Sequence, residues 1–333
     1  MEEKQTRAAR PAVSPGTAGF RDDIIKGLRA TPKRIPPKYF YDEAGSALFE
    51  EITRQREYYV TRTELAVLDA HAAQIDSYLP PGCVIVEFGS GSSTKIRRLL
   101  GSSSKVAGYV PVDISPEMLK IEAANIARDF PRLRVQAVAA DFTRRFALPS
   151  WAGDHPLVGF FPGSTIGNFD PIDAQRLLCD AARTLGAQGL FIVGVDLIKD
   201  RAILDAAYND AAGVTAKFNL NLLSHCNRQL GTDFDHAKFE HRAFFRPDMQ
   251  RVEMHLVSLQ KQFIHLDDFV FGFEHGESVH TENSYKYTIS GFQDLAQVAG
   301  WQPADALTDE ASAFSVHILR RQGTESEPPG YDP

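Results

Sequence analysis

The chain has 333 residues, of which 43% are hydrophobic and 24% charged, a composition typical of a globular protein with one large or two modest domains. Its formal net charge of −7 disfavours a nucleic-acid partner, because proteins that bind nucleic acids usually carry a basic surface. Its three cysteines lack C-x-x-C spacing, so they indicate neither a zinc site nor a disulfide framework. Since we find no signal-peptide core and no apolar run of membrane-spanning length, we expect a cytoplasmic protein without membrane contacts.

The two ends of the chain are predicted to be tails, over residues 1–19 and 323–333. Between them, the first structured stretch is rich in aromatic residues. It also contains Thr61 and Glu64 in the spacing of a capping box, which predicts the start of a helix.

From residue 84 onward, short apolar runs alternate with helical patterns. The predicted strands cover residues 84–88, 106–112, 135–140, 157–161 and 190–195. This alternation is typical of a parallel sheet with helices on both faces. After residue 200 the pattern changes to a helical stretch over 200–231, alternating strands over 251–289, a helix near 291–299 and a strand over 314–320.

We therefore predict an α/β fold with two domains. A Rossmann-like, nucleotide-binding domain takes residues 80–200 and the returning segment 286–322. A second, smaller domain, expected to bind the substrate, takes residues 20–79 and 201–285.

A glycine-rich turn follows the first strand of the nucleotide-binding domain, at Gly89-Ser90-Gly91. Glycine at a strand–helix turn permits a tight bend and lets the backbone approach a ligand closely. The dinucleotide-binding fingerprint requires a third glycine, but Thr94 stands at that position, which disfavours NAD.

Acidic residues end the next two strands. Asp113 is suited to accept hydrogen bonds from ribose hydroxyls, and Asp141 to bind an adenine amino group while Phe142 packs on the base. Each acid also has a simpler role open to it, such as capping of the following helix by Asp113. Together with the glycine turn, the two acids resemble the cofactor site of class I methyltransferases, which implies S-adenosylmethionine as the cofactor.

Five further motifs lie outside the cofactor turn. They are Pro37–Ser46, Glu57–Glu64, Gly163–Asn168, Ala207–Thr215 and Thr281–Ser284. Together they closely resemble the histidine N-α-methyltransferases of ergothioneine biosynthesis, and the likeness runs from about residue 36 to residue 320.

The resemblance implies trimethylation of the α-amino group of L-histidine to hercynine. Because the family's fungal relatives include tryptophan and dimethylallyltryptophan methyltransferases, N-methylation of tryptophan or another aromatic amino acid stays open.

The same resemblance implies a role for individual residues. We expect a monomer with no metal and no partner beyond the amino acid. It assigns the cofactor pocket to Gly89, Ser90, Gly91, Lys95, Asp113, Asp141 and Phe142. It assigns substrate binding to Tyr58, Gly163, Asn168, Tyr208, Met254, Glu282 and Ser284. It gives catalytic roles to Asn168 and Tyr58, and to Tyr41 near the amino group.

The residue types suit these roles. An amide at Asn168 can accept from an amino group and donate to a carboxylate without adding charge. Glu282 and Ser284 lie two residues apart, so on a strand they face the same side and can serve the two nitrogens of an imidazole.

Two other classes of protein share part of this pattern. An NAD-dependent dehydrogenase would use the glycine turn and Asp113, and a non-catalytic adenosyl-ligand sensor would need no Asn168 or Glu282. A metal enzyme is disfavoured, because the pairs His236/His241 and His275/His280 fit no common zinc spacing and are expected to be solvated.

Overall fold

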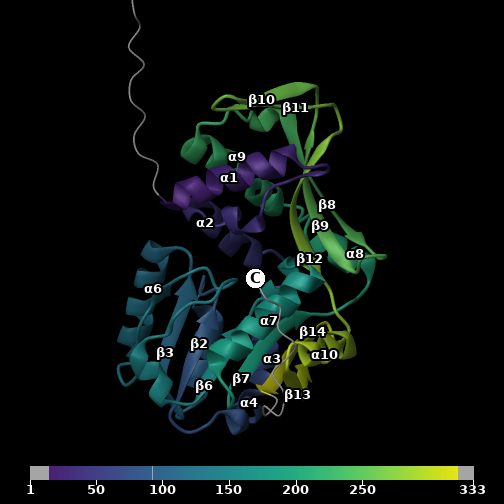
Figure 1. The fold of residues 1–333 in the computed structure, drawn as a ribbon. Coiled ribbons are helices and arrows are strands. Elements are labelled where there is room, and N and C mark those ends of the chain that lie inside the picture. The colour runs from purple at the N-terminus through teal and green to yellow at the C-terminus, as the bar shows by residue number, and fades with distance from the viewer. Residues whose placement is uncertain (1–14, 92, 322–333) are drawn as a thin grey trace, which may run out of the picture. The chain divides into compact units, whose positions relative to one another are not determined.

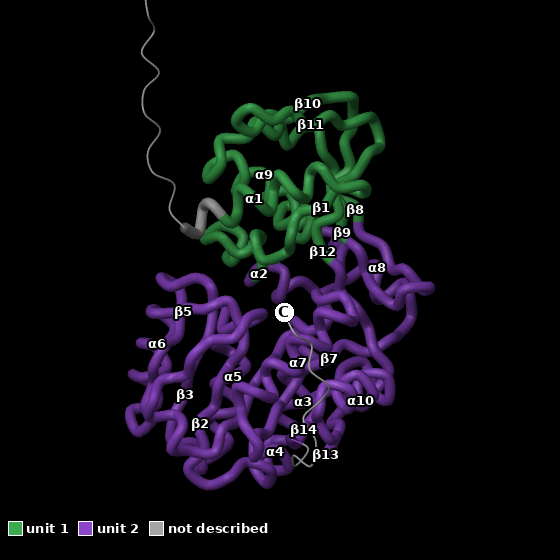
Figure 2. Tube along the Cα trace, viewed as in Figure 1, with its two compact units in different colours: residues 1–49, 213–242, 254–282 green, residues 50–212, 243–253, 283–333 purple. Residues whose placement is uncertain are grey.

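Figure 1 shows the computed structural model of the chain, which describes residues 15–91 and 93–321. The chain forms two compact units, drawn in two colours in Figure 2. Of the described residues, unit 1 comprises 15–49, 213–242 and 254–282, and unit 2 comprises 50–91, 93–212, 243–253 and 283–321. No helix within the described ranges is long and apolar enough to cross a membrane.

Unit 2 is built on an eight-stranded sheet. Its neighbouring strands are, in spatial order, β13 (Trp301–Thr308), β14 (Phe314–Arg321), β7 (Leu190–Asp196), β6 (Leu157–Phe161), β2 (Cys83–Phe88), β3 (Val106–Asp113) and β4 (Arg134–Val135), with β5 (Val138–Ala139) also paired to β3. The strands from β2 to β7 pair in parallel, whereas β14 runs antiparallel to both β7 and β13. The predicted Rossmann-like sheet is thereby confirmed.

The helices of unit 2 lie on both faces of this sheet, as the burial along β7 shows. Val193 and Val195 pack into the main apolar core together with residues of α7 and α10. Gly194 between them faces the other way, where a Cβ would lie only 2.2 Å from an oxygen of Glu64 on α3. The helical segments are α3 (Val60–Ala70), α4 (Ala72–Tyr78), α5 (Thr94–Gly101), α6 (Pro116–Asp129), η2 (Ser150–Asp154), η3 (Thr165–Asn168), α7 (Pro171–Leu185), α8 (Arg201–Ala207) and α10 (Ile289–Val298).

Unit 1 combines helices with parts of a second, four-stranded sheet of order β1-β12-β9-β8, and three strands of that sheet contribute residues to both units. Strand β1 pairs in parallel with β12, with Lys33 opposite Val279. The elements are α1 (Pro15–Arg29), β1 (Lys33–Arg34), η1 (Pro37–Phe40), α2 (Glu43–Thr53), α9 (Val214–Leu230), η4 (His236–Lys238), β8 (Phe239–Arg246), β9 (Arg251–Ser258), β10 (Gln262–Leu266), β11 (Phe269–Phe273) and β12 (Ser278–Tyr285).

Several local predictions were wrong. Residues 15–19 are part of α1 rather than of a tail, while residues 1–14 and 322–333 lie outside the described residues. The strand expected over 135–140 is split into the short β4 and β5. The helical stretch over 200–231 is interrupted between α8 and α9, where Gly213 has a φ of +68°.

The two units differ from the predicted domains chiefly near the N-terminus. Residues 50–79, predicted in the smaller domain, belong to unit 2, and so do residues 201–212. The compact units of the fold thus do not coincide with the predicted domains, and the assignment of the smaller domain to substrate binding stays a prediction.

Candidate active site

The turn after β2 is held tightly against the end of β3. The backbone N–H groups of Gly89 and Ser90 both donate to the carbonyl of Val112, at 2.9 and 3.1 Å. Gly89 has a φ of +78°, and a Cβ there would lie 3.2 Å from the ring of Phe142. Glycine is therefore required by both the backbone conformation and the close approach of Phe142.

Asp113 and Asp141 lie at neighbouring strand ends, because the N–H of Ala140 donates to the carbonyl of Asp113 at 2.9 Å. Asp113 Oδ1 accepts from the backbone N–H of Ser115 at 3.0 Å, and Asp141 Oδ1 accepts from that of Thr143 at 3.0 Å. Burial raises the pKa of Asp113, and the backbone hydrogen bonds offset only part of that rise. Each acid thus rigidifies its own turn.

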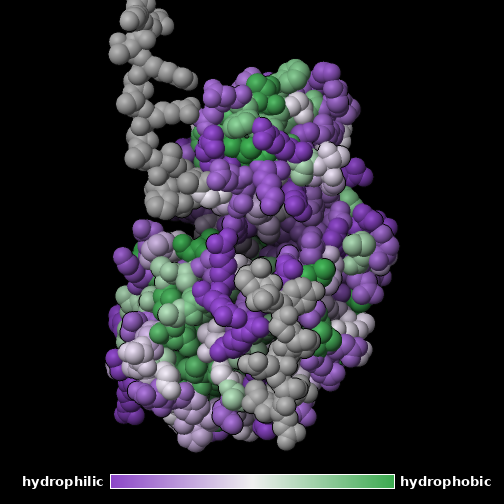
Figure 3. All heavy atoms as spheres, viewed as in Figure 1, coloured by the Kyte–Doolittle hydropathy of each residue, from purple (hydrophilic) through white to green (hydrophobic). Residues whose placement is uncertain are grey.

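Two exposed apolar side chains, Ile114 and Met118, follow the end of β3, and the sequence analysis did not identify them as site residues. Ile114 is 45% exposed and Met118, in the first turn of α6, is 38% exposed. On the face drawn in Figure 3, hydrophobic side chains reach the surface in the region of α6 and β3. Exposed apolar side chains beside a carboxylate suit the flat face and the sugar of a nucleoside.

A buried acid lies beneath the glycine turn. Glu87 on β2 accepts from the Tyr109 hydroxyl, which lies 3.0 Å from Ser90 Oγ. Burial raises the pKa of Glu87 from 4.5 to about 7, against the opposing effect of these hydrogen bonds. The hydroxyl of Ser90, which is predicted in the cofactor pocket, hydrogen-bonds to the Tyr109 hydroxyl.

Glu64 and Lys95 form a buried ion pair under the loop after β6. Glu64 Oε2 lies 2.6 Å from Lys95 Nζ, and their side chains are 1% and 16% exposed. Both carboxylate oxygens also accept the backbone N–H of Gly163 at 2.9 Å. The predicted capping box is therefore wrong: α3 begins at Val60 without a side-chain cap, and Glu64 instead fixes the loop that carries Asn168.

That loop, residues 163–168, includes the short helix η3 and is held by two further contacts. The Ser164 hydroxyl accepts the backbone N–H of Asp196 at 2.9 Å, and Ser164 itself has a φ of 56°. A Cβ at Gly167 would lie 2.7 Å from the carbonyl oxygen of Tyr285, so the loop packs directly on the end of β12. Asn168 is half-buried, and no other residue within 15–91 and 93–321 hydrogen-bonds to its amide side chain. Its amide is thus available for a ligand.

Asp196, at the end of β7, joins two lysines and a tyrosine. Asp196 Oδ2 lies 2.7 Å from Lys286 Nζ, with both side chains fully buried, and Asp196 Oδ1 lies 2.6 Å from Lys199 Nζ. The Tyr59 hydroxyl donates to the same carboxylate. Although burial opposes its charge, the two lysines hold the pKa of Asp196 below its usual value.

Lys286 links this cluster to two predicted substrate-binding residues. Its Nζ donates to Tyr208 Oη at 3.0 Å and to Ser284 Oγ at 2.8 Å. The Tyr208 hydroxyl donates to Ser284 Oγ at 2.7 Å. The rings of Tyr208 and Tyr58 meet edge to face with centroids 6.4 Å apart. Within unit 2 the structure therefore brings Tyr58, Tyr208 and Ser284 together, on a charged cluster that the sequence did not reveal.

The other three predicted residues belong to unit 1. Tyr41 is 39% exposed, with its ring edge-on to Phe49 and Phe218. Met254 on β9 is buried, and Glu282 on β12 is 8% exposed. Their roles stay predictions.

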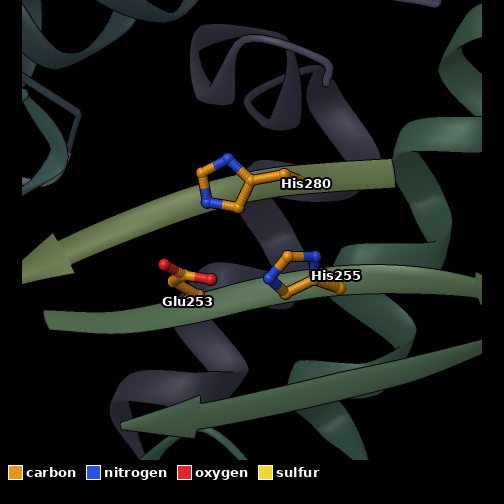
Figure 4. Close-up of side chains that lie close together, drawn as sticks. All are labelled: Glu253, His255 and His280. Carbon is orange, nitrogen blue, oxygen red and sulfur yellow. The ribbon is translucent and has the colours of Figure 1, made fainter. Parts of the chain in front are cut away.

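The histidines are less solvated than expected. His275 is exposed, but His236, His241 and His280 are half-buried, so the prediction was wrong for these three. Figure 4 shows His280 on β12, Glu253 on β9 and His255 on β9. The rings of His255 and His280 have centroids 5.0 Å apart. Glu253 already pairs with Arg251, at 2.6 Å.

Comparison with known proteins identifies the family. The family described as "Histidine-specific methyltransferase, SAM-dependent" matches residues 20–321. The chain is 36% identical to a histidine N-alpha-methyltransferase of Mycolicibacterium smegmatis, over 93% of this chain and 97% of that protein. It is also 36% identical to the histidine N-alpha-methyltransferase of Mycobacterium tuberculosis, over 92% and 96%. Ergothioneine biosynthesis protein 1 of Neurospora crassa is 27% identical over 87% of this chain and 33% of its own length.

These matches span nearly the whole described chain, including the glycine turn, η3 and β12. The chain therefore belongs to the family of S-adenosylmethionine-dependent, histidine-specific methyltransferases.

Proposed function

We propose that the enzyme transfers three methyl groups to the α-amino nitrogen of L-histidine, giving hercynine for ergothioneine biosynthesis. The proposal rests on family membership and on one structural observation. At the carboxyl edge of the unit 2 sheet, the half-buried amide of Asn168 lies on a loop packed against β12, which carries Ser284. Ligands of open α/β sheets bind at this edge.

The residues of unit 2 fit S-adenosylmethionine. A Cβ at Gly91 would meet nothing within 4 Å, so the glycine turn has open space beside it. Asp113 offers a carboxylate for the ribose, and Ile114 offers an apolar surface for the adenine. Phe142 closes the turn against Gly89. When bound, the cofactor supplies an electrophilic methyl group on its sulfonium.

The chain's own task is to hold a neutral amine in line with that methyl group. Asn168 and Tyr58 offer neutral hydrogen-bonding groups, which orient an amino acid without favouring the ammonium form. The cations nearby, Lys95 and Lys286, are paired with buried carboxylates. Alignment of this kind supplies about 7–11 kcal/mol in well-oriented reactions.

A single assay tests the proposal. The purified protein is incubated with methyl-labelled S-adenosylmethionine and an equimolar mixture of the amino acids, and the products are read by mass. Trimethylated histidine is the expected product. Labelled tryptophan in its place would favour the alternative substrate, and cofactor binding without any transfer would favour a sensor.

Competition between histidine and tryptophan tests the specificity. We expect histidine to be favoured by at least about a hundredfold in kcat/KM, since indole leaves one or two polar groups mispaired at roughly 1–3 kcal/mol each. Equal rates would contradict histidine specificity. The monomeric state stays a prediction, which light scattering on the purified protein tests.

A further inference from the structure

Lys286 is a buried cation whose hydrogen-bonding capacity is fully used. An ammonium group has three donors and no acceptor. Those of Lys286 are taken by Asp196 Oδ2 at 2.7 Å, Ser284 Oγ at 2.8 Å and Tyr208 Oη at 3.0 Å. Burial disfavours the charge, but the Asp196 carboxylate, together with the Tyr208 oxygen, raises the pKa of Lys286. Lys286 therefore keeps its proton, and its ammonium group acts only as a hydrogen-bond donor.

The direction of these hydrogen bonds determines what Ser284 can offer a ligand. A serine oxygen can accept two hydrogen bonds and donate one. Ser284 Oγ accepts one from Lys286 and one from the Tyr208 hydroxyl, at 2.8 and 2.7 Å. The remaining capacity of Ser284 is its own hydrogen, so the residue presents a donor and no acceptor.

We propose that Lys286 is a positioning residue that fixes the Ser284 hydroxyl as a donor, so that the site selects amino acids whose ring carries an acceptor nitrogen. The proposal rests on the proposed function and deepens it. A neutral imidazole has one nitrogen with a free lone pair, whereas the indole of tryptophan has only an N–H donor. Selection for the acceptor nitrogen would thus come from a lysine that need not touch the substrate.

Lys199 provides a matched control. Like Lys286, it is a largely buried lysine that pairs with Asp196, at 2.6 Å. Its ammonium group also donates to the Tyr59 hydroxyl, at 2.7 Å, and to the backbone carbonyl of Leu197. Replacing Lys199 therefore perturbs the charge balance of the same carboxylate without removing a donor to Ser284.

The test uses amino acids that differ by one ring nitrogen. The isomers 3-(thiazol-4-yl)-L-alanine and 3-(thiazol-5-yl)-L-alanine place a lone pair at one or the other imidazole nitrogen position, and 3-thienyl-L-alanine has neither. The measured quantity is the preference for the better thiazolyl isomer over the thienyl compound, as a ratio of kcat/KM. If an analogue is not methylated, its inhibition constant against histidine methylation replaces kcat/KM for all of them.

We expect wild type to prefer the thiazolyl ring, and Lys286→Met to reduce that preference roughly threefold to tenfold, the effect of one hydrogen bond. Lys199→Met should keep the wild-type preference. Ser284→Ala should lose it, and adding Lys286→Met to Ser284→Ala should cause no further loss. Because Asp196 keeps Lys199 as its partner in Lys286→Met, this variant leaves no uncompensated charge. If it still does not fold, Lys286→Leu, a second apolar replacement, serves in its place.

An unchanged preference in Lys286→Met, or an equal loss in Lys199→Met, would overturn the proposal. Failure of the proposed function looks different, since wild type would then not methylate histidine at all. Affinity for S-adenosylmethionine, which should be the same in every variant, verifies that each one is folded.

Discussion

Glu64 accepts the backbone N–H of Gly163 with both of its carboxylate oxygens while it pairs with Lys95. Three segments far apart in the sequence, α3, α5 and the loop after β6, therefore meet at one buried carboxylate. Gly163 begins the loop that ends at Asn168. By holding the Gly163 N–H, Glu64 therefore helps to position Asn168, a candidate substrate-binding residue.

Glu64→Ala should lower the free energy of unfolding by about 3–5 kcal/mol, because it leaves the mostly buried Lys95 without its partner. Urea denaturation measures this loss. Glu50→Ala is the control, since Glu50 pairs with Arg54 on the surface, where such pairs contribute little. Equal stability of Glu64→Ala and wild type would contradict the assigned role.

Asp113→Ala should weaken S-adenosylmethionine binding by roughly 1.5–3 kcal/mol, the value of a hydrogen bond to a charged group. Asp113→Asn keeps an oxygen for the Ser115 N–H and should lose less. Titration calorimetry gives both affinities, with the exposed Asp154→Ala as control. Unchanged affinity in a folded Asp113→Ala protein would remove Asp113 from the cofactor site.

Asn168→Ala should lower turnover or raise the KM for histidine, while the cofactor affinity stays close to that of wild type. The amide lies on η3, whereas most of the predicted cofactor residues lie at the ends of β2, β3 and β5. Steady-state kinetics and calorimetry separate the two effects, and Asn125→Ala on α6 controls for loss of a half-buried amide. Loss of cofactor affinity with normal histidine binding would reverse the assignment.

Glu87→Gln should change the pH dependence of stability. The pKa of Glu87 is about 7 in the folded protein and 4.5 ordinarily, so the folded state binds the extra proton between these values. Stability from this group is therefore present below about pH 4.5 and is lost as the pH rises through 7.

The difference between the two pKa values corresponds to about 3 kcal/mol. Glutamine does not titrate, so the variant should gain stability relative to wild type by about this amount from pH 4.5 to 7. Thermal or urea unfolding across that range measures the difference. A constant difference between the two proteins would show that Glu87 titrates normally.

The sequence was most informative where burial is complete. The strands β2 and β7 are uniformly buried, so their apolar runs identified them almost to the residue. Strand β13 was not predicted, because Pro303 and Asp305 interrupt its pattern at a register shift. Strand β8 was also missed: its burial alternates, but a histidine, His241, takes one of the more buried positions and Phe244 one of the less buried ones, so the residue types do not alternate.

The site was predictable only through motifs. The glycine turn and the acids follow strands directly, so local spacing places them at the sheet edge. The roles of Glu64 and Lys286 depend on partners distant in sequence, Gly163 for one and Asp196 for the other. A charged residue in an amphipathic pattern is expected at the surface, and only tertiary structure shows that both are buried.

Strand β14, inserted between β7 and β13, is also the last element of the described chain to leave the ribosome. Until residues 314–321 have been synthesised, β7 has an unpaired edge in the middle of the future sheet, and β13 lacks the strand with which it pairs. An exposed edge of this kind invites pairing with other chains. A nonsense mutation before Phe314 would therefore leave a nascent protein prone to aggregation, although every residue of the candidate active site would already be present.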